Sequence, residues 1–254
     1  MKINNKILKK ISSWFGLKLI EKNYVKNNRL LFEKSPLNID LIFNFLFSNK
    51  YIKTLIQIGA NDGERFDVLN KYIKKYKTKS LLVEPIKKNF EELQNNYKSY
   101  ENIIFENSAI SVNNEISELY KVKDNYLNIY DEHIKGITSF DISHLIKHDV
   151  KKGHITKEKI NSISIKSLIE KYSFNETELI YTDAEGYDGK ILIDFLNNLS
   201  LRPFLVFEYI HIKSPTFNEL LDLLNAKKFF YFALNENIIC IPEEKKSFIF
   251  QSNL

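Results

Sequence analysis

The sequence contains very little cysteine and arginine, and both absences narrow the class of protein. Cys240 is the only cysteine among 254 residues, so the chain cannot form an internal disulfide. That fits a reducing compartment. Only three of the 37 basic residues are arginines, and they do not cluster with aromatic residues as they do in nucleic-acid readers. We therefore expect a cytoplasmic protein without a nucleic-acid partner, whose net charge of +5 reflects lysine-rich, solvated faces.

The sequence also lacks a long uninterrupted apolar run. Near the N-terminus, residues 2–22 mix lysines with apolar residues at helical spacing, but Ser12, Ser13 and Lys18 interrupt them. This pattern supports neither a signal peptide nor a membrane span. It predicts an amphipathic helix, which we expect to pack on the domain; the alternative is peripheral contact with a membrane surface. We expect residues 1–50 to form a helical extension and residues 51–254 to form one α/β domain.

The central part of the chain alternates between buried apolar strands and amphipathic helices. An apolar helix over 38–50 comes first. Such alternation predicts a doubly wound, mostly parallel sheet with both faces covered. Two last strands, over 229–235 and 237–243, predict a closing antiparallel hairpin. The other expected strands cover residues 54–60, 80–85, 102–110, 160–165, 178–183 and 202–212, with a short hairpin at 118–122.

The first strand, in TLIQIGANDG (54–63), ends in a turn that contains two glycines. Gly59 can take backbone angles closed to other residues, and Gly63 removes a Cβ where a helix is expected to begin. In an α/β sheet such a turn brings the backbone against a ligand. The Gly-x-Gly-x-x-Gly pattern of dehydrogenases is absent, since Asn61 stands in the middle glycine's place. The absence of this pattern weighs against NAD as the ligand of the turn.

The second strand ends in Glu84 and Pro85, 21 residues beyond Gly63. A carboxylate at this position can accept hydrogen bonds from both hydroxyls of a ribose. The alternative is a surface glutamate at a strand end, but its place after the glycine turn favours ribose binding.

A polar insert over about 124–160 loses the alternation and contains His133, His144, His148 and His154. His144 and His148 stand four residues apart, behind Ser139 or Asp141 as helix N-cap, so they could share a helix face and bind a metal. No cysteine joins them, and solvated histidines are common in lysine-rich segments. We favour a lid over the substrate instead.

Acidic residues gather at the ends of two later strands. Asp183, Glu185 and Asp188 follow one strand, and Glu208 and His211 follow the next. Carboxylates that repel one another at one strand end are unusual in a purely structural turn. They indicate a reactive edge of the sheet.

These segments, in this order, resemble the FkbM-type S-adenosylmethionine-dependent methyltransferases over about residues 50–212. The resemblance implies a class I methyltransferase sheet of seven strands with the last reversed, and methylation of a hydroxyl on a sugar or natural product. It further implies that the acceptor is a small molecule or glycan. The motifs that carry it are IGANDGE, VEPIKKNFEEL, NSAIS, YTDAEGYDGKIL and RPFLVFE.

The same resemblance implies a role for individual residues. Gly59, Asn61 and Gly63 would hold the methionine part of the donor, and Glu84 its ribose. Ser108 and Ala109 would line the adenine, and Asp183 would face the reacting end. One departure is Gln57, where the family pattern often has an acidic residue that contacts the donor's amino group.

A sugar hydroxyl is a poor nucleophile while protonated, so the acceptor needs a base, for which Asp183, Glu208 and His211 are the candidates. A divalent cation between the acidic strand ends is the alternative, which we do not favour, and we assign no metal ligand. Two other classes stay open: a non-catalytic module that binds a nucleotide or membrane partner, and a nucleotide-dependent oxidoreductase. Calorimetry with S-adenosylhomocysteine and with NAD separates them.

Overall fold

The computed structural model describes residues 38–65, 67–112, 116–131, 134 and 136–246. By its contacts the chain divides into a unit of residues 1–41 and a unit of residues 42–254, and the account below concerns the second. The amphipathic helix predicted over 2–22 lies outside the described residues. None of the described helices has both the length and the apolar character that crossing a membrane requires.

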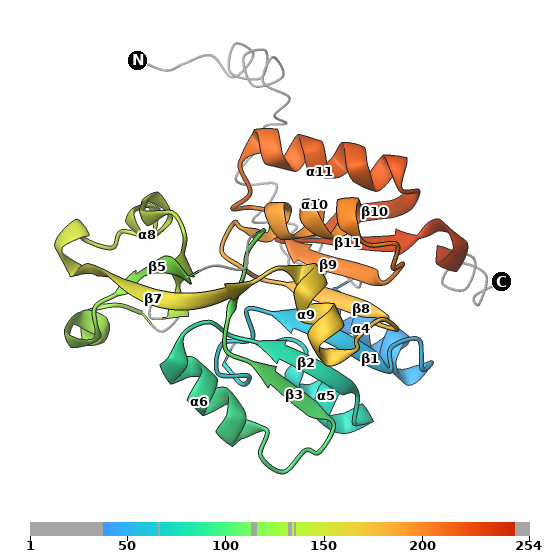
Figure 1. Ribbon diagram of the computed structural model, residues 1–254, viewed down its shortest axis with the longest axis horizontal. Coiled ribbons are helices and arrows are strands. Elements are labelled where there is room, and N and C mark those ends of the chain that lie inside the picture. Colours follow the sequence, from blue (N-terminus) through green and yellow to red (C-terminus); the bar gives the residue numbers. More distant parts are fainter. Residues whose placement is uncertain (1–37, 66, 113–115, 132–133, 135, 247–254) are drawn as a thin grey trace, which may run out of the picture. The chain divides into compact units, whose positions relative to one another are not determined.

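A seven-stranded sheet forms the centre of this unit, with the strand order β10-β11-β9-β8-β1-β2-β3 (Figure 1). Neighbouring strands from β9 to β3 run parallel, and β11 is antiparallel to both β9 and β10. The predicted doubly wound sheet with a C-terminal antiparallel hairpin is thus confirmed. The strands are β1 (Thr54–Ile58), β2 (Lys79–Val83), β3 (Ile103–Glu106), β8 (Leu179–Thr182), β9 (Phe204–Glu208), β10 (Phe229–Leu234) and β11 (Asn237–Pro242).

Helices cover both faces of the sheet. On one face, Phe43 of α4 packs edge-on against Tyr72 of α5 and Tyr181 of β8. On the other face, α9, α10 and α11 bury an apolar cluster against the inward side chains of β1, β8 and β9. The helices are α4 (Ile39–Ser48), α5 (Asn70–Tyr76), α6 (Lys87–Asn96), α9 (Ile165–Tyr172), α10 (Asp188–Asn198) and α11 (Ser214–Ala226).

The register of the sheet aligns the carboxyl ends of its central strands. Ile58 lies beside Val83 on one side and beside Thr182 on the other, and Thr182 lies beside Phe207. The residues that follow these strands therefore emerge next to one another, at the edge where doubly wound sheets bind ligands.

A second, four-stranded sheet corrects the expectation of an irregular insert. Its strand order is β4-β7-β5-β6, and α8 (Ile142–Lys147) accompanies it to one side of the main sheet (Figure 1). The segment has its own apolar cluster, which includes Val122, Leu145 and Val150. The strands are β4 (Ala109–Ile110), β5 (Ile116–Val122), β6 (Thr138–Ser139) and β7 (Ile155–Ile163), with short 3-10 turns at Asp124–Ile129, Lys152–His154 and, after β11, Glu243–Lys245.

Three predicted strands pair differently from what their sequences indicate. The strand expected over 102–110 breaks after Glu106, and its last two residues form β4 in the second sheet. The strand at 118–122 exists within β5, but it pairs with β7 across a long connection rather than in a short hairpin. Residues 160–165, expected in the main sheet, lie mostly in β7. Apolar content predicts each strand, but it carries no information on which partner the strand finds.

Candidate functional site

The turn after β1 is held against the ends of both neighbouring strands. Backbone N–H groups of Gly59 and Ala60 donate to the carbonyl oxygen of Val83 at 3.0 Å each. Gly59 has a φ of +81°, and a Cβ there would lie 2.0 Å from the carbonyl oxygen of Asp183. Only glycine combines this backbone angle with this close approach. The turn thus presents bare backbone toward the acidic strand end.

Glu84 lies under this turn and is 4% exposed. Its carboxylate accepts hydrogen bonds from the backbone N–H of Asn61 at 3.0 Å and of Ile86 at 2.9 Å. Burial raises the pKa of Glu84 to about 7. The side chain borders a cavity of about 90 Å³ that Gln57, Asn61 and Asp183 also line.

Gly63, grouped with Gly59 by the sequence, is not among the lining residues of that cavity. Its φ is +72°, and a Cβ there would lie 2.5 Å from Leu93 and 2.7 Å from the Tyr97 ring. Gly63 therefore allows α6 and the residue after it to pack on the turn, which is a structural role.

Ser108 and Ala109 lie where the chain passes from the main sheet into the second sheet. Together with Pro85 and Phe140 they line a narrow, mainly apolar cavity of about 50 Å³. The Ser108 hydroxyl donates a short hydrogen bond to Glu106. An apolar slot with a few polar groups suits a flat aromatic ring such as adenine.

Asp183 borders both of these cavities. Burial raises its pKa to about 8, and repulsion from the carboxylates of Asp188 and Glu185 adds to this effect. Asp188, by contrast, is fully buried and accepts hydrogen bonds from the backbone N–H groups of Ala184 at 3.0 Å and Gly186 at 3.2 Å. Asp188 therefore stabilises the loop, whereas Asp183 borders the two small cavities.

Glu208 is the last residue of β9, and His211 follows three residues later, beside this loop. Burial raises the pKa of Glu208 to about 9, and repulsion from Asp183 contributes. Burial also lowers the pKa of His211, as does the neighbouring imidazole of His144. Glu208 Oε2 lies 3.8 Å from His211 Nε2 and has no hydrogen-bond partner within the described part of the chain.

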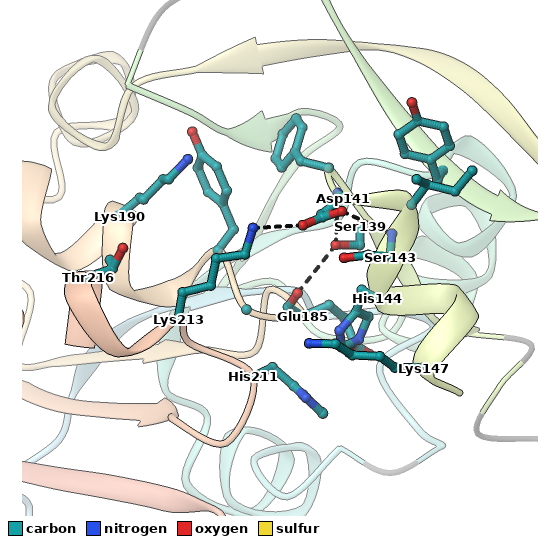
Figure 2. Close-up of a pocket in the computed structure, with 15 residues that line it drawn as sticks. Ser139, Asp141, Ser143, His144, Lys147, Glu185, Lys190, His211, Lys213 and Thr216 are labelled. Carbon is teal, nitrogen blue, oxygen red and sulfur yellow. Dashed lines mark hydrogen bonds and ion pairs between the residues drawn. The ribbon is translucent and has the colours of Figure 1, made fainter. Parts of the chain in front are cut away.

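A larger cavity of about 380 Å³ lies between the insert and the loops that follow β8 and β9 (Figure 2). Glu185 borders this cavity as well as the two smaller ones, so it marks their junction. The polar groups of the wall include Ser143, Lys190 and Thr216. Its aromatic groups are Tyr120, Phe140 and Tyr187.

The structure therefore brings most of the predicted site residues to one edge of the sheet. Gly59, Asn61, Glu84 and Asp183 share one cavity, and Ser108 and Ala109 share a second cavity with Asp183. His211 borders the large cavity, and Glu208 lies beside His211 without lining any of the three.

Sequence reasoning missed how the insert meets this edge. His144 Nε2 lies 2.7 Å from Glu185 Oε2, and Lys213 Nζ lies 2.9 Å from Asp141 Oδ2 (Figure 2). Asp141 is the N-cap of α8; Ser139 and Asp141 are the two residues that the sequence predicts as alternatives for this position. No local pattern reports such pairings, because their members are 41 and 72 residues apart in the chain.

The strand order, with the reversed strand β11 between β10 and β9, and the glycine turn that faces a buried acidic residue define a class I methyltransferase arrangement. The FkbM methyltransferase domain matches residues 57–231. This match covers more than half of the chain, so the chain belongs to the FkbM methyltransferase domain family. The resemblance noted from the motifs is confirmed.

Several solved structures are similar at low sequence identity. Methyltransferase FkbM from Methylobacillus flagellatus KT is 14% identical, with a TM-score of 0.46; the match covers 75% of this chain and 44% of that one. This chain thus spans less than half the length of that protein. A precorrin-6y C5,15-methyltransferase from Geobacter metallireducens GS-15 is 6% identical, with a TM-score of 0.41 and coverage of 80% and 85%. An RNA methyltransferase from Salinibacter ruber, in complex with S-adenosyl-L-homocysteine, is 10% identical, with a TM-score of 0.39 and coverage of 82% and 95%. No protein of curated function matches the chain.

Proposed function

We propose that the protein transfers a methyl group from S-adenosylmethionine to a hydroxyl of a sugar or glycan. The observation that carries this proposal is the junction at Glu185, where two small cavities meet the large one, beside Asp183, which borders both small cavities. A donor in the small cavities and an acceptor in the large cavity would meet at these carboxylates. Methyl transfer needs the two reactants in this relation, since it depends mainly on alignment and exclusion of water.

The residues of the small cavities fit the donor. Glu84 offers a buried carboxylate to ribose hydroxyls, and the slot beside Ser108 and Ala109 suits adenine. Gln57, the departure from the family pattern, is 2% exposed, and its Oε1 has no hydrogen-bond partner among the described residues. A buried acceptor without a partner is costly, and the donor's ammonium group would satisfy it.

The large cavity suits a hydroxyl-rich acceptor because both polar side chains and aromatic rings line its wall. Bound S-adenosylmethionine would supply an electrophilic methyl group. The carboxylate of Asp183 then accepts the proton of the acceptor hydroxyl, since it borders the donor cavities and its buried position makes it more basic than an exposed aspartate.

The insert would exclude water from the reacting groups. The ring of Phe140 packs on Tyr187 with 4.6 Å between ring centroids, and a Cβ on Gly136 would lie 2.8 Å from the Asn61 amide. The Ser139 hydroxyl lies 3.4 Å from the carbonyl oxygen of Glu185. These contacts let the insert cover the strand ends as the predicted lid.

Two measurements test the proposal in sequence. Calorimetry should show binding of S-adenosylhomocysteine and none of NAD; the reverse result contradicts the donor assignment. Labelled donor, offered with a panel of glycans and lipid-linked sugars, then identifies the acceptor. Incorporation into nitrogen or carbon of the acceptor, rather than oxygen, would contradict the hydroxyl assignment.

Asp183→Asn should slow methyl transfer by about 10²–10⁴-fold, the scale of general acid–base groups, while donor binding is largely retained. Glu208→Gln should show a similar or smaller loss. The matched control is Asp194→Asn on α10, whose carboxylate accepts a hydrogen bond from the Asn198 side chain, one turn further along the same helix. Wild-type turnover in Asp183→Asn would remove this residue from the reaction.

A further inference from the structure

Three histidines from two distant segments converge at one side of the large cavity. His144 lies within α8, His148 is the C-cap of this helix, and His211 follows β9; we call these three residues the histidine cluster. One ring nitrogen of each lies within 4.8 Å of the others. The ring centroids of His211 and His144 are 4.5 Å apart, and those of His211 and His148 are 5.3 Å apart.

A carboxylate completes the group. Glu185 Oε2 lies 2.7 Å from His144 Nε2, and a Glu185 oxygen lies within 4.8 Å of a His211 ring nitrogen. Figure 2 shows Glu185, His144 and His211 together beneath the cavity. Each of the three segments involved therefore contributes at least one group that can bind a metal.

Tight contacts fix the three segments relative to one another. Gly186 has a φ of +90°, and a Cβ there would lie 2.7 Å from the carbonyl oxygen of His211. Lys213, two residues beyond His211, pairs with Asp141, three residues before His144. The turn at Glu185 has a left-handed φ of 51°, a conformation that non-glycine residues adopt at some cost. Backbone packing and an ion pair between these segments therefore hold the histidine cluster and Glu185 together.

We propose that the histidine cluster and Glu185 bind one divalent transition-metal ion at the edge of the large cavity. Three imidazoles with one carboxylate form a ligand set for Zn²⁺ or a similar first-row ion, whereas Mg²⁺ prefers oxygen ligands alone. Tetrahedral zinc with ligand distances of about 2.1 Å holds its ligand atoms about 3.4 Å apart. This value lies between the 2.7 Å of the His144–Glu185 pair and the 4.8 Å within which the ligand nitrogens of the three histidines lie.

A second observation points to the same place. The buried Oε2 of Glu208 has no hydrogen-bond partner within the described residues, and it lies 3.8 Å from His211 Nε2. Glu208 also groups with Glu185 and His211 within 4.8 Å. A cation beside His211 would compensate this buried oxygen, which otherwise carries the cost of an unsatisfied polar atom.

With the acceptor hydroxyl as a fifth ligand, the ion would polarise that hydroxyl and lower its pKa, as metals do for bound water. That role rests on the proposed function, but the binding site does not. The test therefore measures Zn²⁺ binding directly, on the full chain after removal of metals with EDTA, by calorimetry. Co²⁺ absorption spectra provide a second readout of nitrogen and oxygen ligands.

We expect one Zn²⁺ per chain in the wild type and an affinity reduced by more than about 100-fold in His211→Ala and in His148→Gln. Loss of an outer-shell partner alone costs about 10–100-fold, and a ligand should cost more. The matched control is His154→Phe, in the same insert: His154 stacks on Tyr126 at 3.9 Å and lies outside the cluster. It should bind Zn²⁺ within about twofold of wild type.

Less than one Zn²⁺ per chain at micromolar concentrations would overturn the inference, as would equal loss in His154→Phe. A variant that loses Zn²⁺ binding must retain the circular dichroism spectrum and the S-adenosylhomocysteine binding of the wild type. If His211→Ala loses the spectrum and the binding as well, that variant is misfolded. The milder change His148→Gln is then judged by the same criteria. Donor binding without Zn²⁺ binding would leave the proposed function intact and reject the metal site. Zn²⁺ binding without donor binding would reject the proposed function and retain the metal site.

Discussion

Glu84 offers the most quantitative test of the donor site, because its environment couples ligand binding to pH. Burial raises the pKa of this carboxyl from 4.5 to about 7. Ribose hydroxyls donate hydrogen bonds to the charged form, so the bound donor should favour the carboxylate. Below pH 7 the free protein must then release a proton as it binds. Affinity for S-adenosylhomocysteine should be about tenfold weaker at pH 6 than at pH 8, or about 1.4 kcal/mol.

The same shift sets the direction of the stability effect without ligand. A folded pKa above the unfolded value means that the contribution of Glu84 is fully present below pH 4.5 and is lost as pH rises through about 7. The loss is about 3 kcal/mol, at about 1.4 kcal/mol for each pKa unit. Bound donor should offset part of it at high pH. Thermal unfolding with and without ligand, across this range, measures both terms.

Calorimetry in buffers of different ionisation enthalpy counts the released proton directly. Glu84→Gln should abolish the release and weaken binding by about 1–3 kcal/mol, since the ribose loses a charged acceptor. Glu178→Gln is a matched control, because Glu178 also accepts backbone N–H groups, from Lys53 and Thr54, but precedes β8 at the opposite edge of the sheet. Affinity that is flat from pH 6 to pH 8, without proton release, would refute the reasoning.

Two further predictions concern the scaffold. Gly59→Ala should lower the free energy of unfolding by more than about 3 kcal/mol and abolish donor binding. A left-handed residue costs about 1–2 kcal/mol, and the new Cβ would lie 2.0 Å from the Asp183 carbonyl oxygen. The control Gly153→Ala, whose Cβ would meet nothing within 4 Å, should stay within about 0.5 kcal/mol of wild type in denaturant titrations. Ser164→Ala should cost about 1 kcal/mol, since Ser164 caps α9 by accepting from the Ser167 N–H at 3.1 Å; Ser164→Asp should restore the loss, and unchanged stability in Ser164→Ala would show that the cap contributes nothing.

The main sheet is predictable from sequence because each strand carries its signal locally. β1, β2, β8 and β9 are apolar runs that end in glycine or acidic residues, and β10 and β11 form a hairpin over a short connection. The insert escapes prediction because its sheet depends on long-range pairing. β7 alternates exposed and buried residues only in part, and its partner β5 begins 39 residues before it. The sequence pattern therefore predicts that a strand exists but not which strand it pairs with.

The grouping of the residues proposed to bind the donor follows from sequence for the same reason: Gly59, Glu84 and Asp183 each stand at the end of a predicted strand, and parallel strand ends share an edge. The grouping of residues around the large cavity does not follow from the sequence. The pair His144 and His148 is visible in the sequence, but its third partner lies 63 residues beyond His148. Whether two histidines at helical spacing form a metal site depends on that third ligand, and only the packing of the insert on the β9 loop supplies it.

The insert leaves and rejoins the rest of the unit at adjacent positions. β4 and β7 run parallel, with Ala109 beside Ser162, and the Ser111 N–H donates to the carbonyl oxygen of Ile163 at 3.1 Å. Chain added or removed between these points leaves the separation of the two ends unchanged. The insert's wall of the large cavity can therefore vary in length and composition while β1, β2 and β8 keep their register, so the proposed donor site could be combined with different acceptors within a single architecture.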